Sequence, residues 1–118
     1  MGTGRVRRLF RRSKRPGQLR EANPADIAHL EQFARSRRGV EGYVEPRTAV
    51  TDTTLVLVAV DGEWTRRRVP SPKYAHEFAN DLGVPSYDAA VVGYPKRMRE
   101  WTSRKSAEQR NPNRLDEA

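Results

Sequence analysis

The feature that most constrains this chain is its longest apolar run, LVLVAV at residues 55–60. It is rich in β-branched residues and does not alternate with polar ones, so it predicts a strand over 53–60 that is buried on both faces. The pair Asp-Gly at 61–62 follows directly and is typical of a two-residue type I′ turn, which predicts a return strand over 63–69. Because that strand carries three consecutive arginines, the hairpin holds both the predicted core and the predicted most charged face.

Two helices are predicted from capping residues and apolar spacing. The pair Asn-Pro at 23–24 is a side-chain cap followed by proline at the first helical position, and apolar residues then recur at helical spacing. This pattern predicts a helix over 24–38 that a glycine ends. The pair Ser-Pro at 71–72 repeats the same start, and it predicts a second helix over 72–82.

Two further segments complete the predicted sheet. Residues 40–48 have weak strand character with an internal glycine and a proline, which favours an edge strand. Residues 87–94 most simply form a last strand, but their alanines leave a short helix open. The fold class is therefore α+β: a small, mostly antiparallel sheet of three to four strands with two helices packed on one face.

Composition divides the 118 residues into three parts. Only 36% of the residues are hydrophobic and 32% are charged, which indicates a small ordered core with disordered flanks. We expect a disordered basic arm over 1–22, a single α+β domain over 23–101 and a disordered polar tail over 102–118. One helical turn at 96–101 would close the domain, with Met98 and Trp101 docked at i, i+3 spacing.

The positive charge is concentrated in the arm. The formal net charge is +8, and residues 1–20 alone hold eight cations and no acid, so the remaining residues balance. Such an arm binds polyanions with little discrimination between them. Val6, Leu9 and Phe10 would share one face of a helical arm, which leaves contact with an anionic membrane surface open as an alternative ranked below nucleic acid.

The sequence contains no motif that indicates a catalytic site, a metal site or a cofactor site. Cysteine is absent, and the two histidines, His29 and His76, lie on different predicted helices without the spacing of a zinc site. Neither a dinucleotide cradle, a phosphate-binding loop nor a nucleophile elbow occurs. The acids at 52, 61 and 63 resemble those of a metal-dependent nuclease, but Thr65 stands where its lysine belongs. We expect no enzyme activity, no metal and no cofactor.

The location follows from the lack of apolar segments. The twin arginine at 7–8 is followed by further charged residues instead of an apolar stretch, so we expect no export signal. The run at 55–60 is too short to span a bilayer. We therefore expect a cytoplasmic protein.

The preferred function is a non-enzymatic accessory protein that binds an anionic polymer, either RNA (including the ribosome) or DNA. The expected binding residues are cations of the arm, of residue 47 and of the return strand: Arg5, Arg7, Arg8, Arg11, Arg12, Lys14, Arg15, Arg47, Arg66, Arg67 and Arg68. Against this function, Glu41, Glu45 and Glu63 are positioned to neutralise the strand arginines across the sheet.

The alternative function is a protein-interaction module of a larger assembly. It would use Tyr94, Met98 and Trp101 as an apolar anchor near the end of the domain. An enzyme of unknown type ranks third.

Four stretches carry a resemblance: GVE at 39–41, EPRT at 45–48, DGEWTRRR at 61–68 and GYPKRMR at 93–99. Together they resemble a group of small, uncharacterised actinobacterial proteins over about residues 24 to 101. Members of this group sometimes carry an oxidoreductase label. The resemblance implies a cytoplasmic actinobacterial protein and supplies no catalytic residue.

Overall fold

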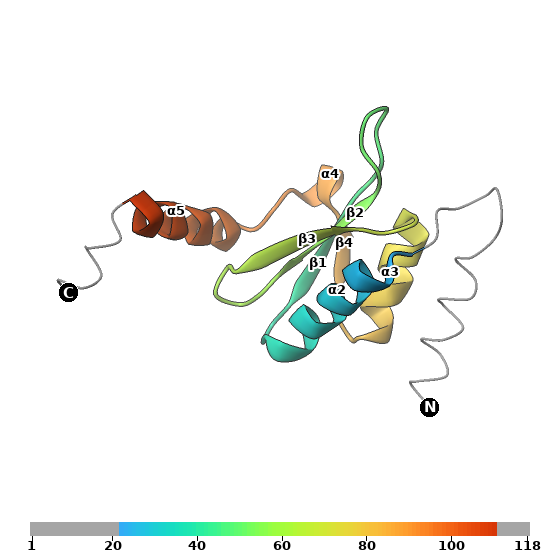
Figure 1. Cartoon of the computed structure of the whole chain (residues 1–118), viewed down its shortest axis with the longest axis horizontal. Coiled ribbons are helices and arrows are strands. Elements are labelled where there is room, and N and C mark those ends of the chain that lie inside the picture. The colour runs from blue at the N-terminus through green and yellow to red at the C-terminus, as the bar shows by residue number, and fades with distance from the viewer. Residues whose placement is uncertain (1–21, 111–118) are drawn as a thin grey trace.

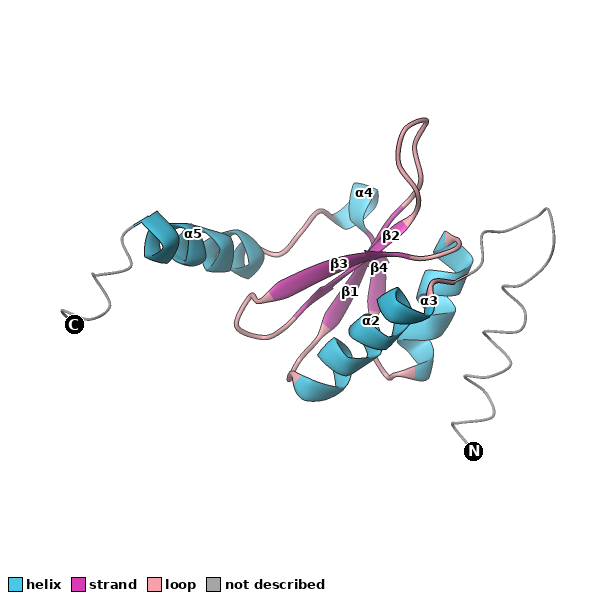
Figure 2. Cartoon of the chain, in the orientation of Figure 1, coloured by secondary structure: helices cyan, strands magenta, loops and turns pink. Residues whose placement is uncertain are grey.

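The computed structural model describes residues 22–110. In chain order, its elements are α2 (Pro24–Ser36), β1 (Glu41–Glu45), β2 (Thr54–Val58), β3 (Trp64–Arg68), α3 (Pro72–Asp81), β4 (Ser86–Asp88), α4 (Ala89–Val92) and α5 (Lys96–Arg110), as Figures 1 and 2 show. Residues 1–21 of the predicted arm over 1–22, and residues 111–118 of the predicted tail, lie outside the described residues. None of the described helices has the length and apolar content needed to cross a bilayer.

The four strands form one sheet in the order β3-β2-β1-β4. The prediction of an edge strand over 40–48 is therefore wrong, because β1 pairs with β2 on one side and with β4 on the other. The pairs β1/β2 and β2/β3 are antiparallel, whereas β4 runs parallel to β1. Helices α2 and α3 pack together on one face of this sheet, and α4 and α5 follow β4 on the other side (Figure 1). The predicted α+β class, with a mostly antiparallel sheet and two helices on one face, is confirmed.

The core consists of two layers with β2 between them. On the side of α2 and α3, Leu55 and Leu57 pack with Leu30 and Phe78. On the opposite side, Val56 and Val58 pack in a smaller cluster with side chains of β1, α4 and α5. All four β2 residues from 55 to 58 are at most 1% exposed, which confirms burial on both faces for these residues. The predicted strand over 53–60 is too long at its end, since β2 stops at Val58 and Val60 is 63% exposed.

The hairpin between β2 and β3 differs from the prediction. A type I′ turn needs positive φ at both central residues, but within the described part of the chain only glycines have positive φ. The loop instead spans three residues, 60–62, closed by hydrogen bonds from the Gly62 N–H to the Ala59 carbonyl and from the Ala59 N–H to the Glu63 carbonyl. Gly62, at φ +96°, occupies the left-handed position of a bulged three-residue loop.

Both alternatives left open for residues 87–94 occur in succession. Residues 86–88 form the short parallel strand β4, and Asp88 then caps the four-residue helix α4 through a 2.9 Å hydrogen bond from the Ala90 N–H. A side chain that caps a helix ends the strand at that point.

The prediction of disorder from residue 102 onward is wrong for residues 102–110, which continue helix α5. Two features explain the longer helix. Most of its residues are good helix formers, with a Lys105–Glu108 pair at i, i+3 spacing. In addition, the Trp64 Nε1–H donates to the Thr102 hydroxyl at 2.8 Å, which ties the middle of α5 to the sheet.

Candidate functional site

The three arginines of β3 alternate between the two faces of the sheet. Arg66 and Arg68 point to the side of α4 and α5, whereas Arg67 points to α2, where its guanidinium lies 3.5 Å from Asp26. Arg68 lies 3.4 Å from Asp52. The run RRR therefore forms no single row of cations.

Arg66 makes the most complete of these pairs. Its Nε and Nη2 donate to the two carboxylate oxygens of Glu45 at 2.8 and 3.0 Å, a bidentate geometry. Glu45 lies on β1, two strands away from β3 in the sheet order. The sequence alternative, in which acids neutralise the strand arginines across the sheet, is therefore found for Arg66.

Glu45 collects further donors from two other elements. The Thr54 hydroxyl donates to it at 2.5 Å, and the Tyr94 hydroxyl also donates to it. Burial alone would raise the pKa of the Glu45 carboxyl, but hydrogen bonds from Arg66, Thr54 and Tyr94 together hold it below its ordinary value. Burial, reinforced by the carboxylate, raises the pKa of Tyr94. Glu45 is thus a saturated structural acceptor.

A second carboxylate on the same face of β1 binds α5. Glu41 accepts hydrogen bonds from Arg97 Nη2 at 2.6 Å and from the Tyr43 hydroxyl at 3.0 Å. Arg97 also donates through Nε to the Ala59 carbonyl at 3.0 Å. The Arg97 hydrogen bond holds the pKa of Glu41 below its usual value, whereas burial and the bond to Glu41 raise the pKa of Tyr43 to about 12.

The three residues of the predicted apolar anchor all lie where α5 meets the domain. Met98 is 8% exposed and belongs to the smaller core cluster. Tyr94 bonds to Glu45, as described above, and packs at the edge of the same cluster. Trp101 is half-buried beside Gly62, and the Lys105 ammonium lies 5.6 Å from its ring centroid. These side chains attach α5 to the sheet and leave little open apolar surface.

Some cations of the described residues have no carboxylate partner. Arg38 follows α2, Arg47 lies in the loop after β1, and Lys73 is in the first turn of α3. The remaining three, Arg99, Arg104 and Arg110, are exposed on α5, and Arg104 donates to the backbone carbonyl of Asp61. Of the predicted binding cations outside the arm, only Arg47 is therefore unpaired.

Sequence reasoning missed the cations of α5 because it predicted a single helical turn and then disorder. The signal that would have found them is the high helix propensity of residues 96–110.

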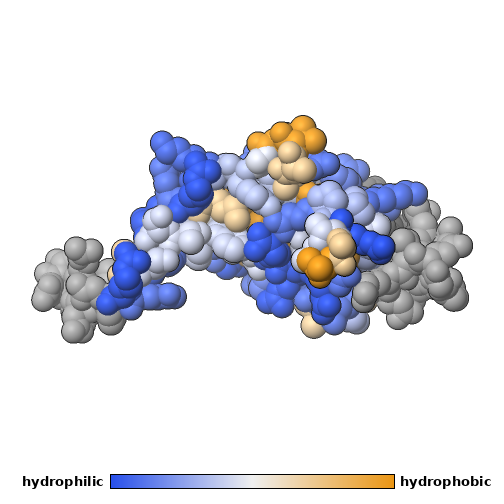
Figure 3. All heavy atoms as spheres, turned by 90° about the horizontal axis from the view of Figure 1, so that it is seen from above, coloured by the Kyte–Doolittle hydropathy of each residue, from blue (hydrophilic) through white to orange (hydrophobic). Residues whose placement is uncertain are grey.

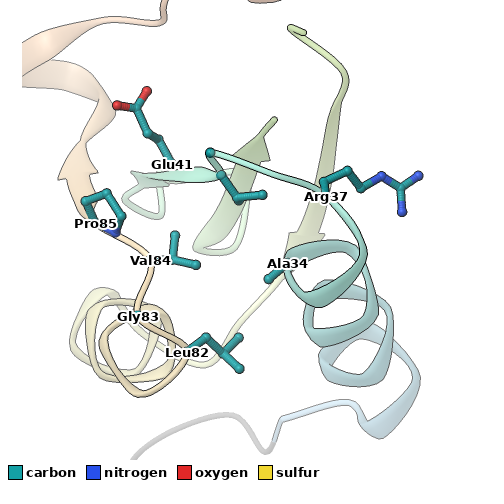
Figure 4. A pocket seen from close by; sticks show the side chains of 9 residues that line it. Ala34, Arg37, Glu41, Leu82, Gly83, Val84 and Pro85 are labelled. Atoms are coloured by element: carbon teal, nitrogen blue, oxygen red, sulfur yellow. The ribbon is translucent and has the colours of Figure 1, made fainter. Parts of the chain in front are cut away.

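A pocket of about 410 Å³ lies between the end of α2, the start of β1 and the turn after α3 (Figure 4). Figure 4 shows Val84, Leu82 and Ala34 around it, whereas the charged ends of Arg37 and Glu41 extend away from it. Arg37 is already bound to Glu63 through two hydrogen bonds of 2.8 and 3.2 Å. The pocket therefore lacks the convergent polar groups by which a small-molecule site orients its ligand.

The two histidines lie apart and serve local hydrogen bonds. His29 Nε2 is 2.6 Å from the Thr65 hydroxyl, and His76 Nδ1 is 2.6 Å from the Ser86 hydroxyl. Burial, followed by the nearby cations Arg67 and Arg37, lowers the pKa of His29. Among residues 22–110, no group of three or more acids and histidines is placed to hold a metal ion.

Exposed apolar side chains occur at several separate places, which include Val60 in the β2–β3 loop, 63% exposed, and Tyr87 of β4, 37% exposed. Val91 and Val92 of α4 are 79% and 55% exposed, while the helix buries only Ala89. Val50, at the tip of the loop between β1 and β2, is 89% exposed. The view from above in Figure 3 shows apolar side chains in separate places on this side, surrounded by polar surface. They form no continuous apolar face.

The chain matches no protein-family model, no curated protein and no solved structure. The resemblance to small actinobacterial proteins thus remains a prediction, and the function must be argued from the residues themselves.

Proposed function

We propose that this protein is a non-enzymatic, cytoplasmic nucleic-acid-binding protein in which residues 1–20 of the arm, the part before Glu21, supply most of the affinity. The distribution of charge carries the proposal. Eight of the 23 cations lie in the arm, where no acid accompanies them. In the described domain, by contrast, fourteen cations face twelve acids, and each of the three β3 arginines lies within ion-pair distance of a carboxylate.

The pairing of Arg66, Arg67 and Arg68 changes the mechanism expected from the sequence. A guanidinium that already binds a carboxylate must lose that partner before it can bind a phosphate, so these side chains are poor phosphate ligands. Residues 1–20 contain no carboxylate side chain that would compete with a phosphate for their cations. These cations would release condensed counterions from the phosphate backbone, which gives salt-dependent and sequence-tolerant binding. RNA, including the ribosome, and DNA both fit this mechanism.

The test compares two charge-matched variants of the full chain. The arm variant is R8E/R11E/R12E, and the control R38E/R47E/K73E changes exposed domain cations that have no ion-pair partner. Each variant lowers the formal net charge from +8 to +2. Binding to fluorescent 20-mers of DNA and RNA is measured by anisotropy at several salt concentrations.

We expect the arm variant to bind more than tenfold more weakly and the control less than threefold. A plot of log affinity against log salt has a negative slope, and its magnitude should decrease by between about two and three in the arm variant, since three phosphate contacts are lost. Equal losses in both variants would show that net charge alone matters, and the arm would lose its special role. Failure of the unchanged protein to bind either polymer at low salt would end the proposal.

A second candidate, a protein-interaction module, is favoured by the exposed valines of α4. A helix that buries an alanine and exposes two valines is the reverse of the usual amphipathic pattern. The variant V91S/V92S should lose a co-purifying protein from a host lysate while it keeps its nucleic-acid affinity. Retention of every partner by that variant would remove this candidate.

A further inference from the structure

Helix α5 has one face that carries hydrogen-bond donors and no carboxylate. The residues of this donor face recur at spacings of 3, 4, 3 and 4, which places them on one side of a helix. They are Lys96, Arg99, Ser103, Ser106 and Arg110. All are exposed except Ser106, which is half-buried.

The donor face is separate from the side by which α5 binds the domain. That side holds Met98, buried against the sheet, and Thr102, which bonds to Trp64. Within the described part of the chain, Arg99 and Arg110 have no ion-pair partner, and Lys96 makes only a 4.0 Å contact with Glu100 while its side chain stays 80% exposed. The donors of this face are therefore available to a ligand, in contrast to those of β3.

The second half of α5 extends beyond its domain contacts. The last of these contacts is a 3.3 Å hydrogen bond from the Arg104 guanidinium to the Asp61 carbonyl. After it, Ala107 is the one apolar residue before the helix ends. Figure 1 shows α5 projecting from the side of the sheet where the β2–β3 hairpin turns. A polar helix of this kind gains little from packing, so its outer face is accessible to a large partner.

We propose that α5 enters the major groove of double-stranded DNA, with Arg99 and Arg110 bound to phosphates on its donor face. This inference rests on the proposed function and specifies its partner. An α-helix is about 10–12 Å wide with its side chains, and the major groove of B-form DNA, about 12 Å wide, admits one. The corresponding groove of A-form RNA is too deep and narrow to be read in this way.

The aromatic residues argue against a single strand as the partner of this site. Stacking platforms for unpaired bases need exposed rings. Tyr43 is only 6% exposed, and Trp64, Tyr94 and Trp101 are held between the sheet and α5. Tyr87 of β4 is the one exposed aromatic residue in the described part of the chain, at 37%, and its ring already packs on Tyr43 with the centroids 5.6 Å apart. Next to α5, the structure thus presents donors for a phosphate backbone but no fully open ring on which a base could stack.

The experiment uses the full-chain variant R99Q/R110Q and the matched control R38Q/R47Q. Each removes two exposed, unpaired arginines, and glutamine is a good helix former, so circular dichroism should show an unchanged helix content. Anisotropy measures the affinity for a 20-base-pair DNA duplex, for the RNA duplex of the same sequence and for one DNA strand. The arm variant R8E/R11E/R12E is measured in parallel.

We expect R99Q/R110Q to bind the DNA duplex about tenfold more weakly, with a salt slope reduced by about two, as two lost phosphate contacts require. The control should change less than threefold, and the other two ligands should not distinguish the variants. Equal losses in both double variants, or equal losses on all three ligands, would overturn the groove assignment.

The arm variant separates the two proposals. If the arm variant loses binding and R99Q/R110Q does not, the proposed role of the arm is supported and the proposed role of α5 is refuted. If R99Q/R110Q loses binding and the arm variant does not, the proposed role of α5 is supported and that of the arm is refuted. If the unchanged protein binds none of the three ligands, both proposals fail.

Discussion

Replacing Glu45 with alanine should destabilise the domain far more than a typical loss of an ion pair. Four hydrogen bonds end on this carboxylate, from Thr54, Tyr94 and twice from Arg66. The Glu45 side chain is only 22% exposed, whereas that of Arg66 is 43% exposed, so water replaces part of the arginine bond in the variant. We therefore assign about 1 kcal/mol to the screened ion pair and about 1 kcal/mol to each hydroxyl bond.

Glu45→Ala should thus lower the free energy of unfolding by about 3 kcal/mol. The matched control is Glu31→Ala, which also removes a glutamate from an arginine. Its pair with Arg35 at i, i+4 spacing lies on the surface of α2, so its loss should cost about 0.5 kcal/mol or less. Urea unfolding of the full chains, followed by tryptophan fluorescence, measures both. Similar costs for the two variants would refute the assignment of Glu45 as a buried structural acceptor.

The same carboxylate gives a pH dependence of defined sign. Because the pKa of Glu45 lies below its ordinary value of 4.5 in the native chain, the unfolded chain binds its proton first as the pH falls. The stabilisation is complete above pH 4.5 and is lost as the pH falls through the native pKa. The isosteric Glu45→Gln variant lacks this contribution, so its stability should approach that of the unchanged protein in acid. A difference that stays constant between pH 7 and pH 3 would contradict this explanation.

Three further predictions concern buried groups. Gly62→Ala would place a Cβ 2.1 Å from the Arg97 carbonyl oxygen. The control is Gly83→Ala, because Gly83 also has a positive φ but an added Cβ there meets no atom within 4 Å. In the same urea assay, Gly62→Ala should lower the free energy of unfolding by at least about 2 kcal/mol more than Gly83→Ala. Tyr43, whose pKa is raised from 10 to about 12, should ionise near pH 12 and not near pH 10 in an absorbance titration, and its contribution to stability, complete below pH 10, should be lost as the pH rises through the native pKa. The buried hydroxyl of Tyr74 has no hydrogen-bond partner among residues 22–110, so Tyr74→Phe should raise the free energy of unfolding by about 1 kcal/mol in urea.

Local signals in the sequence were enough to predict the core of the fold. Residues 55–58 lack alternation because both faces of β2 are covered, and the observed ends of α2 and α3 lie within two residues of the predicted ones. The three-residue hairpin loop was not predictable in the same way. An Asp-Gly pair suits a type I′ turn and a bulged loop alike, and the close approach of α5 to Gly62 is a tertiary feature.

The candidate site shows why a dense run of arginines is a poor guide to a binding surface. Side chains alternate along strands, so Glu41, Tyr43 and Glu45 of β1 face the same side as Arg66 of β3. The sheet order leaves only β2 between them, whose small or apolar side chains let the carboxylate and the guanidinium meet across it. No local pattern in the sequence gives this order.

The ion pairs change which cations are expected to bind phosphate. A dense run of arginines in the sequence favours β3, but the ion pairs of the structure favour α5. The arginines of β3 are adjacent in sequence, but each lies near a carboxylate, whereas Arg99 and Arg110 are eleven residues apart and have none. A phosphate binds most strongly to a cation that has no carboxylate partner to lose. A carboxylate that is already paired with the cation offsets much of the attraction between the cation and the phosphate. The cations to test for polyanion binding are therefore the isolated ones on α5 and those of the acid-free arm.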